Sequence, residues 1–331
     1  MKLISIISKR SALGRNVILL AALPALVMPA WAQTFPAKPI RFVVPTAAGG
    51  NADIVGRIAA EGMARELGQA VYVDNQPAGR QIPGTQMVAR ANPDGYTLLA
   101  VGLAFTANAV LYNDLPYDSV KDFAPVGVVG STPQLVVATP GLAASNMKEL
   151  IALAKARPNT LHYGSAGVGS TAHLGGELLN SMAGIKLVHV AYKGTAQANT
   201  DTMTGVIELS LAAAASVTPL VKSGKLKALG ISSSKRSTQL PEVPTVAETV
   251  PGYDCVLWNG IEAPVATPRP VITRLNAALN KGISSADIKD KLVKAGVEPD
   301  PQSPEQMAAY IDAEIRKWAK VVREAGIQGE R

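Results

Sequence analysis

The amino-acid sequence predicts an α/β protein made of two lobes, each with a mostly parallel sheet and helices on both faces. Three observations lead to this fold class. Short apolar stretches alternate with segments of helical spacing, a pattern typical of parallel sheets. About 300 residues follow a predicted signal segment, which is long for a single core. The composition, 47% hydrophobic and 17% charged, indicates a large buried core and not a disordered chain.

Residues 1–32 are predicted to be a cleavable secretory signal. Four basic residues and no acidic residue precede an apolar run over residues 17–30. This run ends in an A-x-A cleavage site at residues 30–32. A membrane anchor is the alternative. The run is shorter than the roughly 20 residues that a spanning helix needs, and two prolines interrupt it. We therefore expect export by a Sec-type route, with cleavage after Ala32.

Charge, cysteine and histidine content argue against several classes of function. The chain has a formal net charge of +7, but four positive charges lie in the predicted signal, and no run of Lys or Arg suits nucleic acid. Cys255 is the only cysteine, so no intrachain disulfide can form. His162, His173 and His189 lack the spacing of a metal site. We expect no metal, no cofactor and no nucleic-acid partner, and we expect each histidine to be a hydrogen-bonded structural residue.

The first part of the mature chain alternates strands with helices. The mostly apolar sequence PIRFVVP predicts the first strand, and the helix that follows has apolar residues at helical spacing up to Gly68. The predicted strands are 39–45, 71–74 and 96–101, and the predicted helices are 53–67 and one that ends over 86–91.

The same alternation returns later in the chain, and the C-terminal part is mostly helical. The last helix has an apolar stripe at i, i+3, i+4 spacing, which indicates packing on a lobe. The predicted strands are 135–138, 161–164, 187–191, 206–211 and 226–231, and the predicted helices are 147–156, 174–182, 270–282, 286–295 and 304–325.

The loop after the first strand is a candidate anion site, because ligands of open α/β sheets bind beyond the carboxyl ends of the strands. Ala47, Ala48 and Gly49 are small enough to let a ligand approach the backbone, and the next helix directs free N–H groups at it. Asn51 is expected to be the N-cap of that helix. Asp53 would repel a carboxylate placed directly on it, so we interpret it as a capping and positioning residue. A tight turn without a ligand is the alternative.

A second candidate anion site follows the strand over 161–164 and also leads into a helix. It resembles a P-loop without the lysine, and a loose G-x-G-x-x-A dinucleotide motif over 167–172 without an acidic residue after the next strand, so nucleotide binding is not expected. Its candidate ligand-binding residues are Ser165, Ala166, Gly167, Ser170 and Thr171, whose amides and hydroxyls can donate hydrogen bonds.

Lys193 follows another strand of the same part, either as a cation near the cleft or as an ordinary surface lysine. Catalytic groups are harder to find. The sequence has no G-x-S-x-G motif, and no histidine is evident beside a nucleophilic serine with an orienting acid. We therefore expect a binding protein and not an enzyme. An exported hydrolase that uses Ser165 or Ser170 stays as an alternative.

Several motifs resemble those of the tripartite tricarboxylate transporter substrate-binding proteins, also called the Bug family. They occur in the family's order and cover nearly the whole mature chain. They include residues 35–45 (FPAKPIRFVVP), 92–99 (NPDGYTLL), 121–125 (KDFAP), 189–194 (HVAYKG) and 240–245 (LPEVPT).

This resemblance implies a monomeric periplasmic protein with the type II Venus-flytrap fold. Its lobes, residues 33–133 with 255–331 and residues 134–254, would be joined by two crossing hinge strands. They would close on a small organic carboxylate, including a dicarboxylate or an aromatic acid, held by both candidate loops. Membrane transporter subunits are the implied partners, and a sensor kinase is the alternative.

Two places depart from the family's usual pattern. A glycine-rich stretch after the second strand is replaced here by Pro77-Ala78-Gly79-Arg80-Gln81, so that Arg80 could pair with a second carboxylate or lie in a solvated loop. A polar or acidic residue is replaced by the run Ala212–Ala215, which could form an apolar wall. Both departures leave the fold prediction intact and leave the ligand open.

Overall fold

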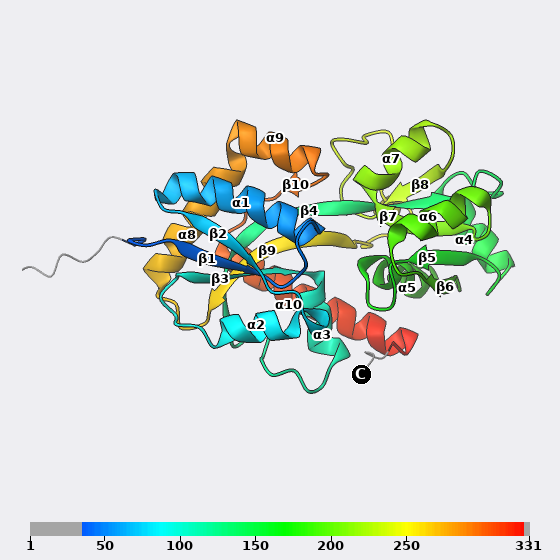
Figure 1. Cartoon of the computed structure of the whole chain (residues 1–331). Helices are drawn as coiled ribbons and strands as arrows, with labels where there is room; N and C mark the ends of the chain where they lie inside the picture. Colours follow the sequence, from blue (N-terminus) through cyan, green and yellow to red (C-terminus); the bar gives the residue numbers. More distant parts are fainter. Residues whose placement is uncertain (1–34, 328–331) are drawn as a thin grey trace, which may run out of the picture. The chain divides into compact units, whose positions relative to one another are not determined.

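A computed structural model describes residues 35–327 (Figure 1). The predicted signal lies outside these residues. No helix of the described part is long and apolar enough to cross a membrane. The described strands form a 10-stranded mixed sheet in the order β2-β1-β3-β9-β4-β7-β5-β6, with β8 and β10 pairing additionally with β4. The α/β fold class is confirmed.

The first half of the sheet consists of β1, β2, β3 and β9 with the first part of β4. β1 pairs in parallel with β2 and β3, whereas β9 is antiparallel to β3 and β4. Its elements are β1 (Ile40–Val44), α1 (Asn51–Leu67), β2 (Val71–Asn75), α2 (Ile82–Ala89), β3 (Thr97–Gly102), α3 (Leu103–Leu111), β4 (Phe123–Ala138), β9 (Val256–Pro264), α8 (Arg269–Ser284), α9 (Ala286–Lys294), β10 (Glu298–Pro299) and α10 (Pro304–Ala325).

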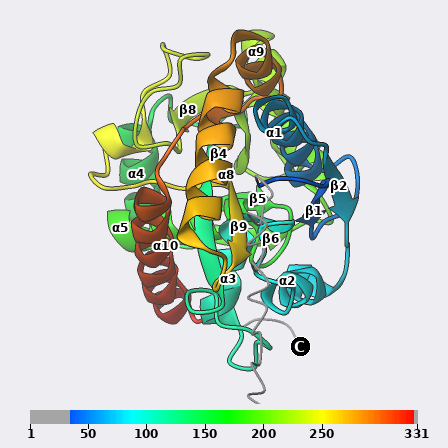
Figure 2. The ribbon, with the colours of Figure 1, turned by 90° about the vertical axis from the view of Figure 1, so that its left-hand side faces the viewer.

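Helices cover both faces of this half (Figures 1 and 2). α1, α8 and α9 lie on one face and bury residues such as Met63, Leu275 and Leu292 against the sheet. α2, α3 and α10 lie on the other face. The predicted stripe of α10 is buried there through Met307 and Trp318, so the interpretation of this helix as a packed one is confirmed.

The second half of the sheet consists of β5–β8 with the last part of β4. β5 pairs in parallel with β6 and β7, and β4 is antiparallel to β7 and β8. Its elements are α4 (Met147–Ala156), β5 (His162–Ser165), α5 (Thr171–Ala183), β6 (Val188–Ala191), α6 (Thr195–Thr204), β7 (Leu209–Ala213), α7 (Ala214–Lys222) and β8 (Lys227–Ile231).

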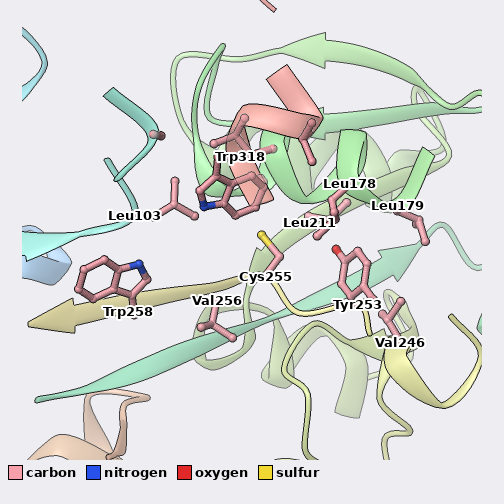
Figure 3. Close-up of a cluster of buried hydrophobic side chains, with 14 of the residues drawn as sticks. Leu103, Leu178, Leu179, Leu211, Val246, Tyr253, Cys255, Val256, Trp258 and Trp318 are labelled. Carbon is pink, nitrogen blue, oxygen red and sulfur yellow. The ribbon is translucent and has the colours of Figure 1, made fainter. Parts of the chain in front are cut away.

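β4 joins the two halves. It pairs with β9 up to Pro133, and from Gln134 onward it pairs with β7 and β8. A hydrophobic cluster follows the same path (Figure 3). Leu103 and Trp258 of the first half, Leu178 and Leu211 of the second half and Trp318 of α10 belong to one buried set, which also contains the Cys255 thiol.

The structure corrects two element boundaries. The strand expected over 206–211 begins only at Leu209, because the N–H groups of Val206 and Ile207 donate to Asp201 O and complete the end of α6. The strand expected over 135–138 is the end of the much longer β4, whose first part contains Pro125 and Pro133 and so did not resemble a strand interior.

Candidate functional site

A cavity of about 250 Å³ lies at the carboxyl ends of β1 and β3. Its wall consists of the start of α1, the β3–α3 junction, part of β9, Gln81 from the turn before α2, and Thr171 at the start of α5. Thr171 belongs to the second half of the sheet, so both halves contribute to the wall. None of these lining residues has a charged side chain. An anion in this cavity would therefore have to be held by amides, hydroxyls and the α1 dipole.

Asp53 fixes the loop between β1 and α1. Its buried carboxylate accepts hydrogen bonds from Gly49 N (2.8 Å) and Asn75 Nδ2 (2.9 Å) and forms an ion pair with Arg57 (2.9 Å). Burial alone would raise the pKa of Asp53, but these three partners together hold it below its usual value. The carboxylate is thus already engaged and stays ionised, which suits a positioning residue.

Asn51 is not the N-cap of α1, contrary to the sequence-based expectation. Gly50 occupies the cap position without a side-chain hydrogen bond, because Asn51 already has helical geometry as the first residue of the helix. Its side chain instead contacts two neighbouring strands, β4 and β9. Asn259 Nδ2 donates to Asn51 Oδ1 (3.2 Å), and Asn51 Nδ2 lies 3.5 Å from Thr132 Oγ1. Asn51 therefore ties the α1 N-terminus to β4 and β9 in the cavity wall.

Ala47, Ala48 and Gly49 lie exposed on the same loop, outside the cavity wall. Gly49 has a φ of 83°, a conformation that glycine adopts without strain. The first loop therefore contributes through both of its ends, where Pro45 and Thr46 on one side and Gly50, Asn51 and Ala52 on the other line the cavity.

The second loop is held in place by a pair of histidines, of which His173 is buried and His189 is partly buried. Ser165 Oγ lies 2.6 Å from His189 Nε2, and Gly169 N donates to His173 Nδ1 (3.1 Å). The two imidazole rings stack with their centroids 3.9 Å apart. Burial lowers the pKa of His173 to about 4, and burial together with His173 does the same for His189. Both histidines are hydrogen-bonded, as the sequence analysis expected.

The Ser165–His189 contact places a histidine beside a serine, a contact that the sequence alone did not reveal. The two residues are far apart in sequence, and only the parallel pairing of β5 and β6 brings them together. Ser165 is 0% exposed and its hydroxyl also donates to Gly167 O (3.1 Å). A nucleophile must reach its substrate, so this pair supports the loop and does not form a catalytic centre.

Of the remaining candidate residues of the second loop, only Thr171 belongs to the cavity wall. Ser170 is the N-cap of α5, and its hydroxyl accepts from His173 N and donates to Gly167 O (2.7 Å). Thr171 lines the cavity, whereas Ser165, Ala166, Gly167 and Ser170 do not. Lys193 is exposed on the turn between β6 and α6, also outside the wall.

Arg80 is not among the residues that line the cavity, whereas its neighbour Gln81 is. The Arg80 guanidinium carbon is 5.0 Å from the centre of the Tyr112 ring, and Asn108 Nδ2 donates to Arg80 O (2.9 Å). The run Ala212–Ala215 does not line this cavity either. Ala214 and Ala215 begin α7 and line a separate cavity with Gly296.

Sequence reasoning missed several wall residues, chiefly Gln81, Asn259 and the β3–α3 junction. The junction follows a strand, as do the two candidate loops, and Gly102 at the end of β3 is a signal in the sequence for it. A Cβ at Gly102 would lie 2.6 Å from Trp258 O, so glycine is required where β3 meets β9. No local signal identifies Gln81 or Asn259, because each reaches the wall only through tertiary contacts.

The chain is similar to known proteins in both sequence and fold. The model of the tripartite tricarboxylate transporter family receptor matches residues 55–327. The periplasmic binding protein BugD is 33% identical and superposes with a TM-score of 0.70, over 89% of this chain and 100% of BugD.

Two further solved structures contain a carboxylate. A protein of R. palustris with adipate is 33% identical, with a TM-score of 0.73 over 89% of this chain and 99% of that one. MatC of Rhodopseudomonas palustris with bound malate is 30% identical, with a TM-score of 0.69 over 87% of this chain and 100% of that one.

Proposed function

This chain belongs to the tripartite tricarboxylate transporter family of receptors, and from that membership we propose that it captures a small organic carboxylate in the cavity between β1, β3, β9 and α5. The family and its solved neighbours are substrate-binding proteins and not enzymes. Adipate and malate in two neighbours support a carboxylate as the ligand class.

The observation that carries this proposal is the uncharged cavity at the N-terminus of α1. A carboxylate placed there accepts hydrogen bonds from the first-turn amides and from Asn51, and the helix dipole offsets its charge. Asp53 keeps the loop rigid, so little ordering free energy is lost on binding. The second loop, with Ser165, Ala166, Gly167 and Ser170 behind Thr171, would approach the ligand when the protein closes.

We also propose that the two halves of the sheet are the two lobes of a flytrap, with their boundary where β4 changes partners between Pro133 and Gln134. Export of the mature protein to the periplasm fits the family's location. Delivery to a tripartite membrane transporter is the proposed task, and ligand sensing for a membrane receptor is the second candidate. Deleting the gene separates them, since a transport protein supports ligand uptake and a sensor supports ligand-induced transcription.

A thermal-shift screen of the mature protein tests carboxylate capture. The screen contains malate, benzoate and acids of four to six carbons whose far end is a methyl, a hydroxyl or a carboxylate group. A ligand at about 100 times its Kd adds roughly 2.7 kcal/mol of stability, which gives a clear upward shift. The proposal is wrong if no organic anion shifts the melting temperature while a non-anionic solute does.

A further inference from the structure

The turn between β2 and α2 is strained at two successive residues. Arg80 has a φ of 58° and Gln81 a φ of 72°, in the left-handed region that costs free energy for residues with a Cβ. Asn159 is the other non-glycine residue with positive φ among residues 35–327, and asparagine tolerates this conformation better. The strain is therefore concentrated at Arg80–Gln81, and Gln81 lines the cavity.

Neighbouring residues hold the backbone of this turn in place. Gln81 N donates to Ala78 O (2.8 Å), Gln81 O accepts from Thr85 Oγ1 (2.8 Å), and Asn108 Nδ2 donates to Arg80 O (2.9 Å). Thr85 and Asn108 are both buried. Glycine could adopt the same backbone without strain. Glycine would supply no side chain, whereas Gln81 lines the cavity and carries a neutral side-chain amide.

The wall of the cavity that Gln81 lines also contains two buried polar atoms without a hydrogen-bond partner in the described part of the chain. Thr46 Oγ1 and Trp258 Nε1 are buried and make no hydrogen bond within the described part of the chain. Trp258 is only 3% exposed, and its indole nitrogen lies on the side of Leu103, which also lines the cavity (Figure 3). Buried polar atoms are rarely left unpaired, and both residues belong to the wall of the cavity that Gln81 lines.

We propose that Gln81 determines specificity, by hydrogen bonding through its neutral amide to the end of the ligand remote from the carboxylate. This inference rests on the proposed function. Because no cationic side chain lines the wall, a second carboxylate buried at this end would lack a counter-charge. The ligand class is accordingly a monocarboxylate whose far end carries an uncharged hydrogen-bonding group, such as a hydroxyl.

The variant Gln81→Gly tests this inference, because it removes the amide and relieves the strain together. Without ligand, its melting temperature should rise by about 1 to 3 °C, since relief of strain exceeds the entropy that glycine adds to the unfolded chain. The wild type should bind the hydroxy acid at least threefold more tightly than the methyl acid of equal length, and the variant should lose this preference. Titration calorimetry at matched chain lengths measures both.

Asn159→Gly is the matched control, because Asn159 has a φ of 59° but is exposed on the turn before β5. It should leave both affinities unchanged. If Gln81→Gly melts at a lower temperature, the turn is not strained; if it keeps the preference for the hydroxy acid, Gln81 does not recognise the ligand. Either result overturns the inference while carboxylate binding by the wild type stands. If the wild type binds no carboxylate at all, both the proposed function and this inference are wrong.

Discussion

Glu262 is a carboxylic acid in the middle of β9 that is only 1% exposed. Its Oε2 has no hydrogen-bond partner among residues 35–327, and burial raises its pKa well above the usual value. The folded protein therefore holds a proton at Glu262 that the unfolded chain releases above about pH 4.3. Because the folded state binds more protons, the free energy of unfolding falls as the pH rises above that value.

Replacing this acid by its neutral isostere should stabilise the protein. Glu262→Gln should raise the free energy of unfolding at pH 8 by about 1 to 3 kcal/mol, because a neutral amide avoids the cost of burying or protonating the carboxylate. The gain should shrink towards pH 4. Urea denaturation at both pH values measures it, with the exposed Glu242→Gln as the control that stays within about 0.5 kcal/mol. A destabilised Glu262→Gln at pH 8 would contradict this account.

At the scale of elements, the stacked histidines of α5 and β6, which hold the second loop, make the stability of the fold depend on pH. Both have pKa values of about 4, chiefly because they are buried, and Glu177 only partly offsets this for His189. A depressed pKa means that the folded state binds fewer protons than the unfolded chain, where histidine titrates near 6.5. The contribution of the two histidines to the free energy of unfolding is therefore fully present above about pH 6.5 and is lost as the pH falls towards 4.

Removing one histidine should make this loss less steep. In His189→Gln the amide can still contact Ser165, and the denaturation midpoint should change less between pH 7 and 4.5 than in the wild type. His162→Gln is the control, because His162 lies at the other end of β5 and pairs with Glu208 (3.1 Å). An equal pH dependence in the wild type and His189→Gln would show that the pair does not carry the effect.

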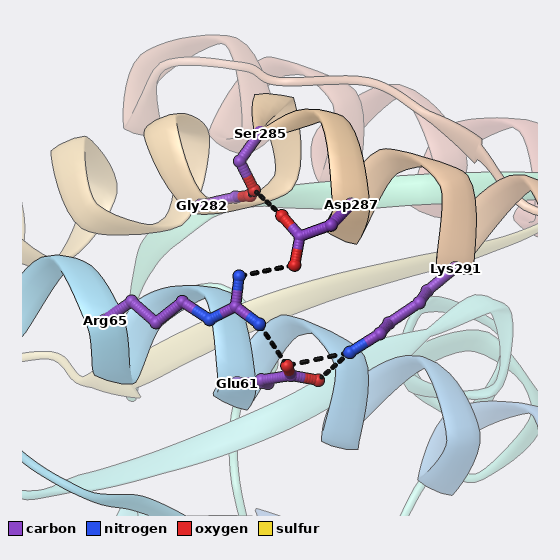
Figure 4. A network of polar contacts seen from close by, with 6 residues as sticks. All are labelled: Glu61, Arg65, Gly282, Ser285, Asp287 and Lys291. Atoms are coloured by element: carbon purple, nitrogen blue, oxygen red, sulfur yellow. Dashed lines mark hydrogen bonds and ion pairs between the residues drawn. The ribbon is translucent and has the colours of Figure 1, made fainter.

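The contact between α1 and α8 depends on two glycines. A Cβ at Gly282 would lie 2.6 Å from the Gly62 carbonyl carbon, so the two backbones touch. An ion-pair network runs beside them (Figure 4), in which Arg65 bonds to Asp287 (2.5 Å) and Lys291 to Glu61 (2.6 Å). These side chains are largely exposed, and such pairs contribute little stability. Close backbone packing, more than charge, fixes this helix pair.

Gly282→Ala should therefore destabilise the fold by about 1 to 3 kcal/mol, because backbone atoms cannot move aside as side chains can. Gly141→Ala is the matched control. Nothing lies within 4 Å of a Cβ at Gly141, and its φ is not positive. Thermal or urea unfolding of both variants measures the difference. A Gly282→Ala protein as stable as the wild type would show that the helices can separate without loss.

For the whole molecule, closure of the proposed lobes should be visible through Trp258. This residue lies on β9 and lines the cavity, whereas Trp318 is 0% exposed in the core. Trp31 belongs to the predicted signal. A carboxylate that stabilises the protein should change the tryptophan emission of the wild type. Trp258→Phe should abolish the change and Trp318→Phe should keep it. A change that survives in Trp258→Phe would place the reporter elsewhere.

Local patterns sufficed to predict β1, α1, β3, β5, α5 and the C-terminal helices, because each has the apolar period of its own element. They also sufficed to predict the two glycine-rich loops, whereas Asp53 contacts the loop through Gly49 N and does not cap α1. Strand β9 was missed from the pattern, since its sequence VLWNGIEAP contains a glycine and a buried glutamate and lacks a regular period. α3 was missed because it follows β3 without any break residue except Gly102.

The sequence by itself determined the fold class, the family resemblance and the presence of two glycine-rich loops after strands, because these depend on residues that are neighbours along the chain. Only the tertiary structure decided which residues meet. It brought His189 to Ser165, Asn259 to Asn51, and Gln81 to the cavity that its neighbour Arg80 was expected to line. Such contacts depend on strand pairing and on the φ angles of a strained turn, and these are set by the packing of the whole chain and not by any local pattern.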